Sequence, residues 1–137
     1  MSYNSLISNP TLHTTGDTQY IQRNAAQIVR ALTGDHDRWD GILVPNDTSG
    51  MAVGPLVAYM LQVPLAIAII KEGRCWVHAC DVHLDGREPY GLRYVFVDDQ
   101  ISSGRTVRES MAKLNQEDLR ATVVGTYEYQ FERVTWF

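Results

Sequence analysis

The sequence predicts an α/β domain with a mainly parallel sheet and flanking helices. Apolar runs of strand length alternate with segments whose apolar residues recur at helical spacing, which indicates strands joined by crossover helices. The apolar runs are short and continuous, as in strands that are covered on both faces. No internal repeat, low-complexity run or linker is visible, and 45% of the 137 residues are hydrophobic. Residues 1–137 are therefore expected to form one domain with an ample core.

The first expected element is a helix that follows an irregular segment. Residues 1–17 are polar and contain two turn signals. Asp17 or Thr18 can cap a helix that runs to about Leu32, and Gly34 ends it. The apolar positions with helical spacing are Ile21, Ala25, Ile28, Val29 and Leu32.

A strand, a helix and a second strand are expected next. Residues 41–44 are apolar and predict a short buried strand. Residues 45–50 have loop composition, and 51–61 predict a helix despite the Gly54-Pro55 pair near its start. Residues 65–70 predict a second buried strand.

The second half continues the alternation after a mixed segment. Residues 71–91 contain two turn signals, and we expect a mobile hairpin or long loop there. A third strand is expected over 93–97, a helix over 106–114 and a fourth strand over 121–127. The aromatic tail, 131–137, is expected to add another strand or to cover the ligand site.

Composition excludes several classes of function. The formal net charge is -4, which argues against a general nucleic-acid surface because phosphate backbones need a basic patch. No stretch has the apolar length of a membrane span, and the N-terminus lacks the pattern of a signal peptide. Two cysteines are too few for a secreted disulfide framework. The default expectation is a cytoplasmic protein with no nucleic-acid or membrane partner.

One cysteine- and histidine-rich segment invites a test for zinc. Its four potential ligands, within nine residues, are Cys75, His78, Cys80 and His83. If the segment is extended, Cys75 points to one face while His78 and Cys80 point to the other, which is poor zinc geometry. An ordinary strand or loop with buried thiols is favoured.

The richest chemistry lies where the third strand runs into the next helix. Ligands of parallel sheets bind beyond the carboxyl ends of the strands, where loops 45–50, 71–91 and 98–105 converge. The first amides of a helix lack internal partners and form a phosphate cradle. Gly104 lets the backbone approach a ligand. Hydroxyl donors and one positive charge come from Ser102, Ser103, Thr106 and Arg105.

Two adjacent carboxylates precede this turn. Asp98 and Asp99 end a buried strand, and burying them costs free energy that some partner must offset. Sugar hydroxyls, a hydrated Mg2+ or the helix amides could do so. Alternatively, one carboxylate caps the turn and the other faces solvent. Because the acids and the cradle are contiguous, we favour a site for a phosphorylated sugar.

Residues 95–106, VFVDDQISSGRT, closely resemble the phosphoribosyl-pyrophosphate-binding motif of type I phosphoribosyltransferases. The one departure is Gln100, where an apolar residue is usual. The resemblance implies a Rossmann-like core, here with a minimal hood. It also implies that Asp98 and Asp99 meet the ribose 2- and 3-hydroxyls and anchor the sugar during catalysis, and that residues 102–106 hold the 5-phosphate.

The resemblance covers residues 39–127. Residues 39–44 are similar to the first core strand of the family, and Lys71 closes a segment similar to its second strand. Residues 72–91 occupy the place of the mobile loop that closes over the substrate. The segment similar to the pyrophosphate loop consists of Asp47, Thr48, Ser49 and Gly50.

Beyond the motif pattern itself, two positions differ from residues that particular relatives carry. Ser49 stands where many relatives carry Arg or Lys, so Lys71, Mg2+ and backbone amides would balance the charge of the leaving group. Ser102 stands where relatives of the hypoxanthine type have an acid, and a hydroxyl cannot replace that general base at neutral pH. This argues against a 6-oxopurine substrate.

The resemblance implies binding of phosphoribosyl pyrophosphate with Mg2+, held through the substrate, and transfer of the phosphoribosyl group to a nucleobase with release of pyrophosphate. The alternative is a non-catalytic regulatory module that binds phosphoribosyl pyrophosphate or a nucleotide. Hydrolysis of a phosphorylated sugar is less favoured because no nucleophile–base pair is visible. A homo-oligomer is expected from the family. Trp136 is the preferred residue for stacking on a base, against simple packing in the core or an interface.

Overall fold

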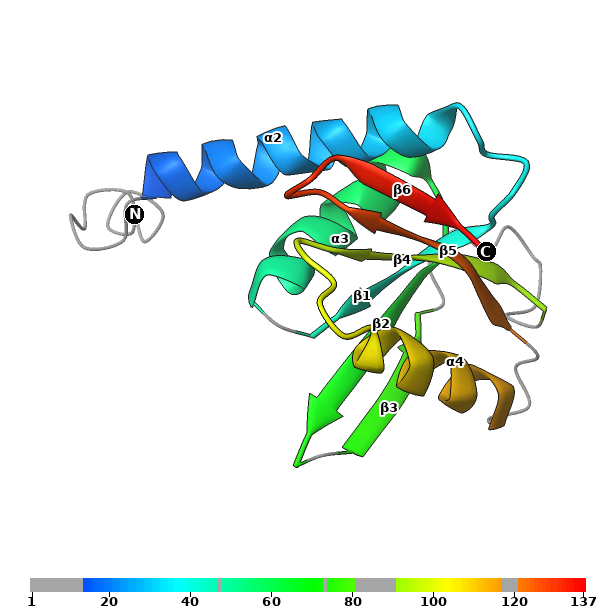
Figure 1. The fold of residues 1–137 in the computed structure, drawn as a ribbon. Helices are drawn as coiled ribbons and strands as arrows, with labels where there is room; N and C mark the ends of the chain where they lie inside the picture. Colours follow the sequence, from blue (N-terminus) through cyan, green and yellow to red (C-terminus); the bar gives the residue numbers. More distant parts are fainter. Residues whose placement is uncertain (1–13, 47, 73, 81–90, 117–120) are drawn as a thin grey trace.

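The computed structural model describes residues 14–46, 48–72, 74–80, 91–116 and 121–137. Helices and strands alternate along the chain (Figure 1). Their bounds are α2 (Thr14–Thr33), β1 (Gly41–Pro45), α3 (Thr48–Leu61), β2 (Leu65–Lys71), β3 (Arg74–Ala79), β4 (Arg93–Asp98), α4 (Arg105–Gln116), β5 (Thr122–Glu128) and β6 (Arg133–Trp136).

The strands form one six-stranded sheet in the order β3-β2-β1-β4-β5-β6. The four central strands are parallel, and the two edge strands, β3 and β6, are antiparallel to their neighbours. The predicted α/β class with a mainly parallel sheet is therefore confirmed. Because the central strands are parallel, their carboxyl ends meet at one edge, which we call the carboxyl edge.

Helices cover both faces of the sheet, with α2 and α3 on one side and α4 on the other (Figure 1). Neighbouring strand residues serve the two cores in turn: Val44 and Val95 pack with the α2–α3 core, whereas Leu43 and Phe96 pack on the α4 side. All four side chains are buried. This double coverage explains why the strands read as continuous apolar runs.

Helix α3 begins at Thr48, so the predicted 45–50 loop is wrong over most of its length. Pro45 belongs to β1, and Pro55 lies inside the helix. A proline within a helix costs about 3 kcal/mol. Packing offsets this cost, because Gly54 lies directly against Val44 of β1 and the helix is apolar along its length. The other helices and strands differ from the predicted bounds by a few residues at most.

The structure decides between the alternatives expected for two segments, 71–91 and 131–137. Lys71 pairs with Arg74 across the hairpin, which confirms a hairpin in the first part of the 71–91 segment, while residues 81–90 lie outside the described residues. The tail forms the added strand β6, which runs back from the carboxyl edge rather than covering it. Among the described residues, no helix is long and apolar enough to span a membrane.

Within the cysteine- and histidine-rich segment, residues 74–79 form the ordinary strand β3. In β3 the buried Cys75 lies with its sulfur 3.9 Å from Oγ of Ser110 on α4, while His78 is exposed. The half-buried Cys80 follows the strand, and His83 lies outside the described residues. The alternation of strand side chains thus separates Cys75 from His78.

Candidate functional site

The loop between β4 and α4 forms a cavity at the carboxyl edge. Its volume is about 190 Å3, and its lining consists of Phe96, Asp98 and residues 100–107. The structure therefore brings Asp98 together with all five predicted phosphate-turn residues, 102–106. Asp99 follows Asp98 directly but does not line the cavity.

The turn at the start of α4 has the backbone shape that its glycine permits. Gly104 has φ of +75°, in the left-handed region that favours glycine. The Arg108 amide donates to the Gly104 carbonyl at 3.0 Å, which closes the first helical turn. Ser103 Oγ accepts a bond from the Arg105 amide at 3.3 Å. An exposed helix N-terminus with adjacent hydroxyls is suited to an anion.

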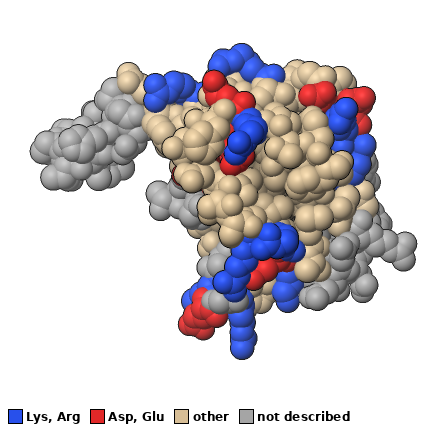
Figure 2. Space-filling model, viewed as in Figure 1, with Lys and Arg blue, Asp and Glu red and all other residues tan. Residues whose placement is uncertain are grey.

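Two arginines flank this turn with different partners. Nε of Arg105 donates to Glu109 at 2.8 Å, and this bond raises the Arg105 pKa. Arg108, which the sequence reasoning missed, donates from Nη1 to the Ser103 carbonyl at 2.8 Å. Figure 2 shows basic and acidic side chains next to each other on the lower part of this face, around α4 and the β2–β3 hairpin. Because Arg105 pairs with Glu109 while Arg108 bonds the Ser103 carbonyl, the Arg108 guanidinium is the one that holds the turn.

The two aspartates accept backbone amides of their own loop, and Asp98 also lines the cavity. Oδ1 of Asp98 accepts the Asp99 amide at 2.8 Å, and Oδ1 of Asp99 accepts the Gln100 amide at 2.7 Å. Both side chains are half-buried. These hydrogen bonds offset part of the free energy that burial of the two carboxylates costs, and they orient each side chain.

Glu128 is the acidic residue at this edge that the sequence reasoning missed. It ends β5 as the register partner of Asp98, and its side chain is buried. The Ile101 amide donates to its Oε1 at 3.1 Å, and Arg133 donates to its Oε2 at 2.8 Å. The available signal was a lone acid at the carboxyl end of an apolar strand, parallel to the strand that ends in Asp98.

The predicted pyrophosphate side lies at the carboxyl ends of β1 and β2. Thr48, Ser49 and the buried Gly50 open α3, and Asp47 lies outside the described residues. The last register pair of β1 with β2 is Pro45–Ala68. Because β2 continues to Lys71, this exposed lysine projects past that edge.

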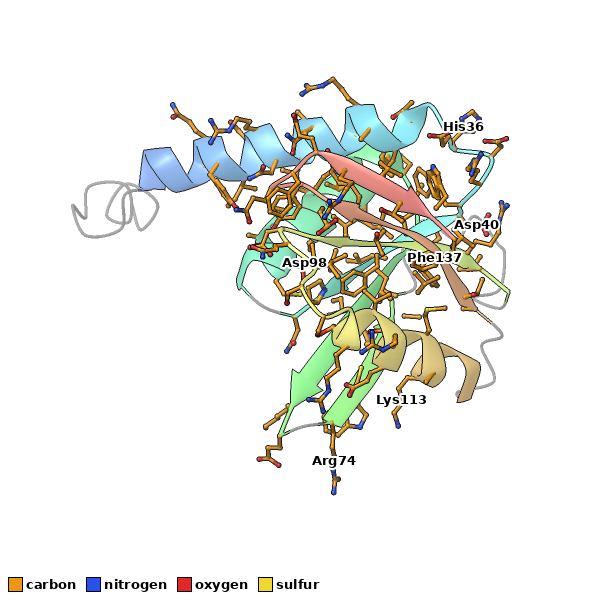
Figure 3. The ribbon with its side chains drawn as sticks, viewed as in Figure 1. His36, Asp40, Arg74, Asp98, Lys113 and Phe137 are labelled. Atoms are coloured by element: carbon orange, nitrogen blue, oxygen red, sulfur yellow. The ribbon has the colours of Figure 1, made fainter. Side chains whose placement is uncertain are left out.

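The aromatic tail residues are divided between the two ends of the sheet. Trp136 packs at the end opposite the cavity, over Gly125 and with the Arg38 guanidinium carbon 5.3 Å from its ring centre. Figure 3 shows its neighbour Phe137 at the far end of the sheet from Asp98. The structure therefore does not bring Trp136 to the other predicted site residues. Tyr127 and Tyr129 are buried, whereas Phe131, in the β5–β6 turn at the carboxyl edge, is 51% exposed.

The donor set at the cavity fits a hydrated magnesium ion better than a metal ion held by protein side chains alone. In the described part of the chain, no three or more His, Cys, Asp or Glu side chains gather into a protein cage for a metal. Asp98 and Asp99 nevertheless offer carboxylate oxygens beside the phosphate turn. Mg2+ usually keeps several waters and binds one or two carboxylates together with substrate phosphates.

Fold and site together define an α/β protein whose sheet carries, at its carboxyl edge, adjacent carboxylates and a helix-opening turn suited to an anion. No protein-family model matches the chain, and no curated protein is significantly similar to it in sequence. Solved structures do match. The adenine phosphoribosyltransferase from Thermoanaerobacter pseudethanolicus has a TM-score of 0.58 and 21% identity, over 82% of this chain and 69% of that one.

Two further structures extend this likeness. The orotate phosphoribosyltransferase from Francisella tularensis has a TM-score of 0.59 and 17% identity, over 78% of this chain and 50% of that one. The adenine phosphoribosyltransferase from Saccharomyces cerevisiae has a TM-score of 0.56 and 18% identity, over 89% and 69%. This protein has the fold of the type I phosphoribosyltransferases.

Proposed function

We propose that the protein binds phosphoribosyl pyrophosphate with Mg2+ and transfers the phosphoribosyl group to a nitrogenous base, releasing pyrophosphate. The observation that carries this proposal is the cavity formed by Asp98 and the 102–106 turn on a type I phosphoribosyltransferase fold. The Saccharomyces cerevisiae enzyme was solved with an imino-altritol bisphosphate and adenine, which supports a phosphorylated sugar analogue and a base as ligands of this fold.

Each part of the edge has one role in this proposal. The first amides of α4 and the hydroxyls of Ser102, Ser103 and Thr106 bind the 5-phosphate, with Arg105 adding charge at the rim. The carboxylates of Asp98 and Asp99 accept hydrogen bonds from the ribose 2- and 3-hydroxyls. Lys71 and the Asp47–Gly50 segment serve the pyrophosphate.

Transfer needs no protein nucleophile. The bond from C1 to the pyrophosphate oxygen breaks and its electron pair leaves with pyrophosphate, the acceptor nitrogen bonds to C1, and the proton of that nitrogen passes to water or to the released pyrophosphate. Mg2+ held through the substrate would supply charge neutralisation for the departing pyrophosphate. Asp98 and Asp99 hold the ribose while positive charge develops on it, and the phosphate turn fixes its other end, so the reacting atoms stay aligned.

A non-catalytic binding module is the second candidate. Residue 102 is a serine with an exposed side chain, so the turn offers no carboxylate there to take the proton of a base. The guanidinium of Arg105 is also paired with Glu109 rather than held ready for a ligand. Such a site would bind phosphoribosyl pyrophosphate and act through a partner.

Calorimetry and a nucleobase screen test the proposal. Purified protein with Mg2+ should bind phosphoribosyl pyrophosphate, and one base should trigger pyrophosphate release that the D98N/D99N double variant loses. Binding without release for every base would favour the module. No heat at millimolar ligand in the wild type would end both readings.

The homo-oligomer implied by the family resemblance belongs to the same proposal. Light scattering of the purified protein should give a mass of at least twice the 15.5 kDa of one chain. A mass equal to that of one chain at all concentrations would contradict this part.

A further inference from the structure

Glu128 is a buried acid whose contacts all concern the ligand loop and its support. Only 4% of the residue is exposed. Burying a carboxylate costs several kcal/mol unless hydrogen bonds and an opposite charge compensate it. The partners that compensate this cost show what the carboxylate holds in place.

The two carboxylate oxygens of Glu128 bind two different segments at the carboxyl edge, the β4–α4 loop and strand β6. Oε1 accepts the amide of Ile101, which lies between the paired aspartates and the phosphate turn. Oε2 accepts a hydrogen bond from Nε of Arg133, the first residue of β6, at 2.8 Å, and it forms an ion pair with Nη2 of the same residue at 2.8 Å. One buried side chain thus ties the β4–α4 loop to the β5–β6 hairpin.

The backbone after Glu128 continues the same attachment. The Tyr129 amide donates to the Asp98 carbonyl and the Gln130 amide to the Asp99 carbonyl, both at 3.0 Å. Figure 1 shows the β5–β6 turn beside the carboxyl end of β4. Three consecutive residues, 128–130, therefore hold the loop at residues 98, 99 and 101.

We propose that Glu128 is a positioning residue that fixes the backbone of residues 98–101, and through it sets the spacing between the paired carboxylates and the phosphate turn. The ligand named for this site rests on the proposed function above. The hydrogen bond from the Ile101 amide to Glu128 is the contact that positions the loop. The ion pair with Arg133 orients the carboxylate toward that amide. Because Glu128 is buried and does not line the cavity, it acts on a ligand through the loop.

Two substitutions of similar size separate this role from general stability. In Glu128→Gln the amide oxygen can still accept the Ile101 amide, whereas Glu128→Met removes both acceptors and stays apolar in a buried place. A hydrogen bond to a charged group contributes about 1.5–3 kcal/mol, so Glu128→Met should weaken phosphoribosyl pyrophosphate binding about 10- to 100-fold. Glu128→Gln should restore most of that affinity.

Asp40 provides a matched control at the opposite end of the sheet (Figure 3). Its carboxylate also accepts one backbone amide, that of Arg93 at 2.8 Å, and pairs with an arginine, Nε of Arg93 at 3.1 Å. Asp40→Ala should lower the free energy of unfolding without changing the affinity of the folded protein. The same loss of affinity in Asp40→Ala would show a general effect of stability and overturn the positioning role.

Hydrogen exchange of the amides of residues 99–104 provides a readout that is independent of the ligand. Glu128→Met should lose protection there while β1 and β2 keep theirs, and Asp40→Ala should not. If wild-type protein binds no phosphoribosyl pyrophosphate, the proposed function fails, yet unchanged loop protection in Glu128→Met still decides against positioning. Should Glu128→Met not fold, Arg133→Met must show the loop change in a milder form, and unchanged loop exchange in it overturns the proposal.

Discussion

The guanidinium of Arg108 donates through Nη1 to the carbonyl of Ser103 at 2.8 Å, so helix α4 holds the turn that precedes it. The bond crosses Gly104, whose carbonyl also accepts the Arg108 amide. A carbonyl bound in this way cannot turn toward an anion in the cavity. In the function proposed above, Arg108 therefore keeps the Ser103 carbonyl away from the 5-phosphate and leaves the backbone amides of the turn to bind it.

Arg108→Ala should accordingly weaken phosphoribosyl pyrophosphate binding. Loss of one charge-assisted hydrogen bond corresponds to about 1.5–3 kcal/mol, or about tenfold or more in the dissociation constant. Lys113→Ala, on the same helix, also removes one positive charge but touches no turn carbonyl among the hydrogen bonds described. Calorimetry of both variants separates the specific bond from net charge, and equal affinities in them would contradict the role of Arg108.

Gly104→Ala should strain the same turn. The φ of +75° disfavours a side chain by about 1–2 kcal/mol, and the new Cβ would lie 3.1 Å from Nη1 of Arg108. We expect a lower free energy of unfolding and weaker ligand binding, because the methyl group also displaces the Arg108 side chain. Urea denaturation measures the first effect and calorimetry the second.

Gly34→Ala is the control for this glycine. A Cβ at Gly34 would meet no atom within 4 Å, and its φ lies outside the left-handed region. Alanine there should be neutral or stabilise the fold by up to about 1 kcal/mol through the unfolded chain. If Gly104→Ala were as harmless as Gly34→Ala, the turn would not depend on its glycine.

The buried phenol of Tyr94 makes the free energy of unfolding depend on pH in the alkaline range. Burial raises its pKa from 10.0 to about 12, so the folded protein keeps the phenol proton that the unfolded chain releases. Stability from this group is complete below pH 10 and is lost as pH rises from about 10 to 12. The loss amounts to about 2–3 kcal/mol. Tyr94→Phe should flatten this part of the profile, measured by urea denaturation at several pH values; an unchanged slope would refute the assignment.

The sequence predicted the site where its chemistry is contiguous. Asp98, Asp99 and Gly104 lie within one short segment, so their types and order indicate both the strand end and the helix start. Glu128 is distant in sequence, and its role depends on β5 lying next to β4, which no local pattern specifies. Trp136 was chosen for its ring alone, but β6 runs away from the carboxyl edge and carries it to the other end.

The start of α3 is another feature that a local sequence pattern does not specify. Turn-forming residues over 45–50 favoured a loop, and Pro55 argued against a long helix. In the structure α3 packs closely on β1, because Gly54 lies against Val44 where no side chain fits. Local propensity was outweighed by packing between two elements that the sequence shows separately.

Gly54→Ala tests that contact directly. A Cβ at residue 54 would lie 2.7 Å from Cγ1 and 2.8 Å from Cγ2 of Val44, which is too close for carbon atoms. Because Val44 is fully buried on β1, neither it nor the helix can move without disturbing the core, and overpacking of this kind costs about 1–3 kcal/mol. The double variant with Val44→Ala removes the opposing methyl groups, so its loss of stability should be smaller than the sum of the two single losses. Denaturation of all four proteins measures this coupling, and strict additivity would mean that α3 does not owe its position to the Gly54–Val44 contact.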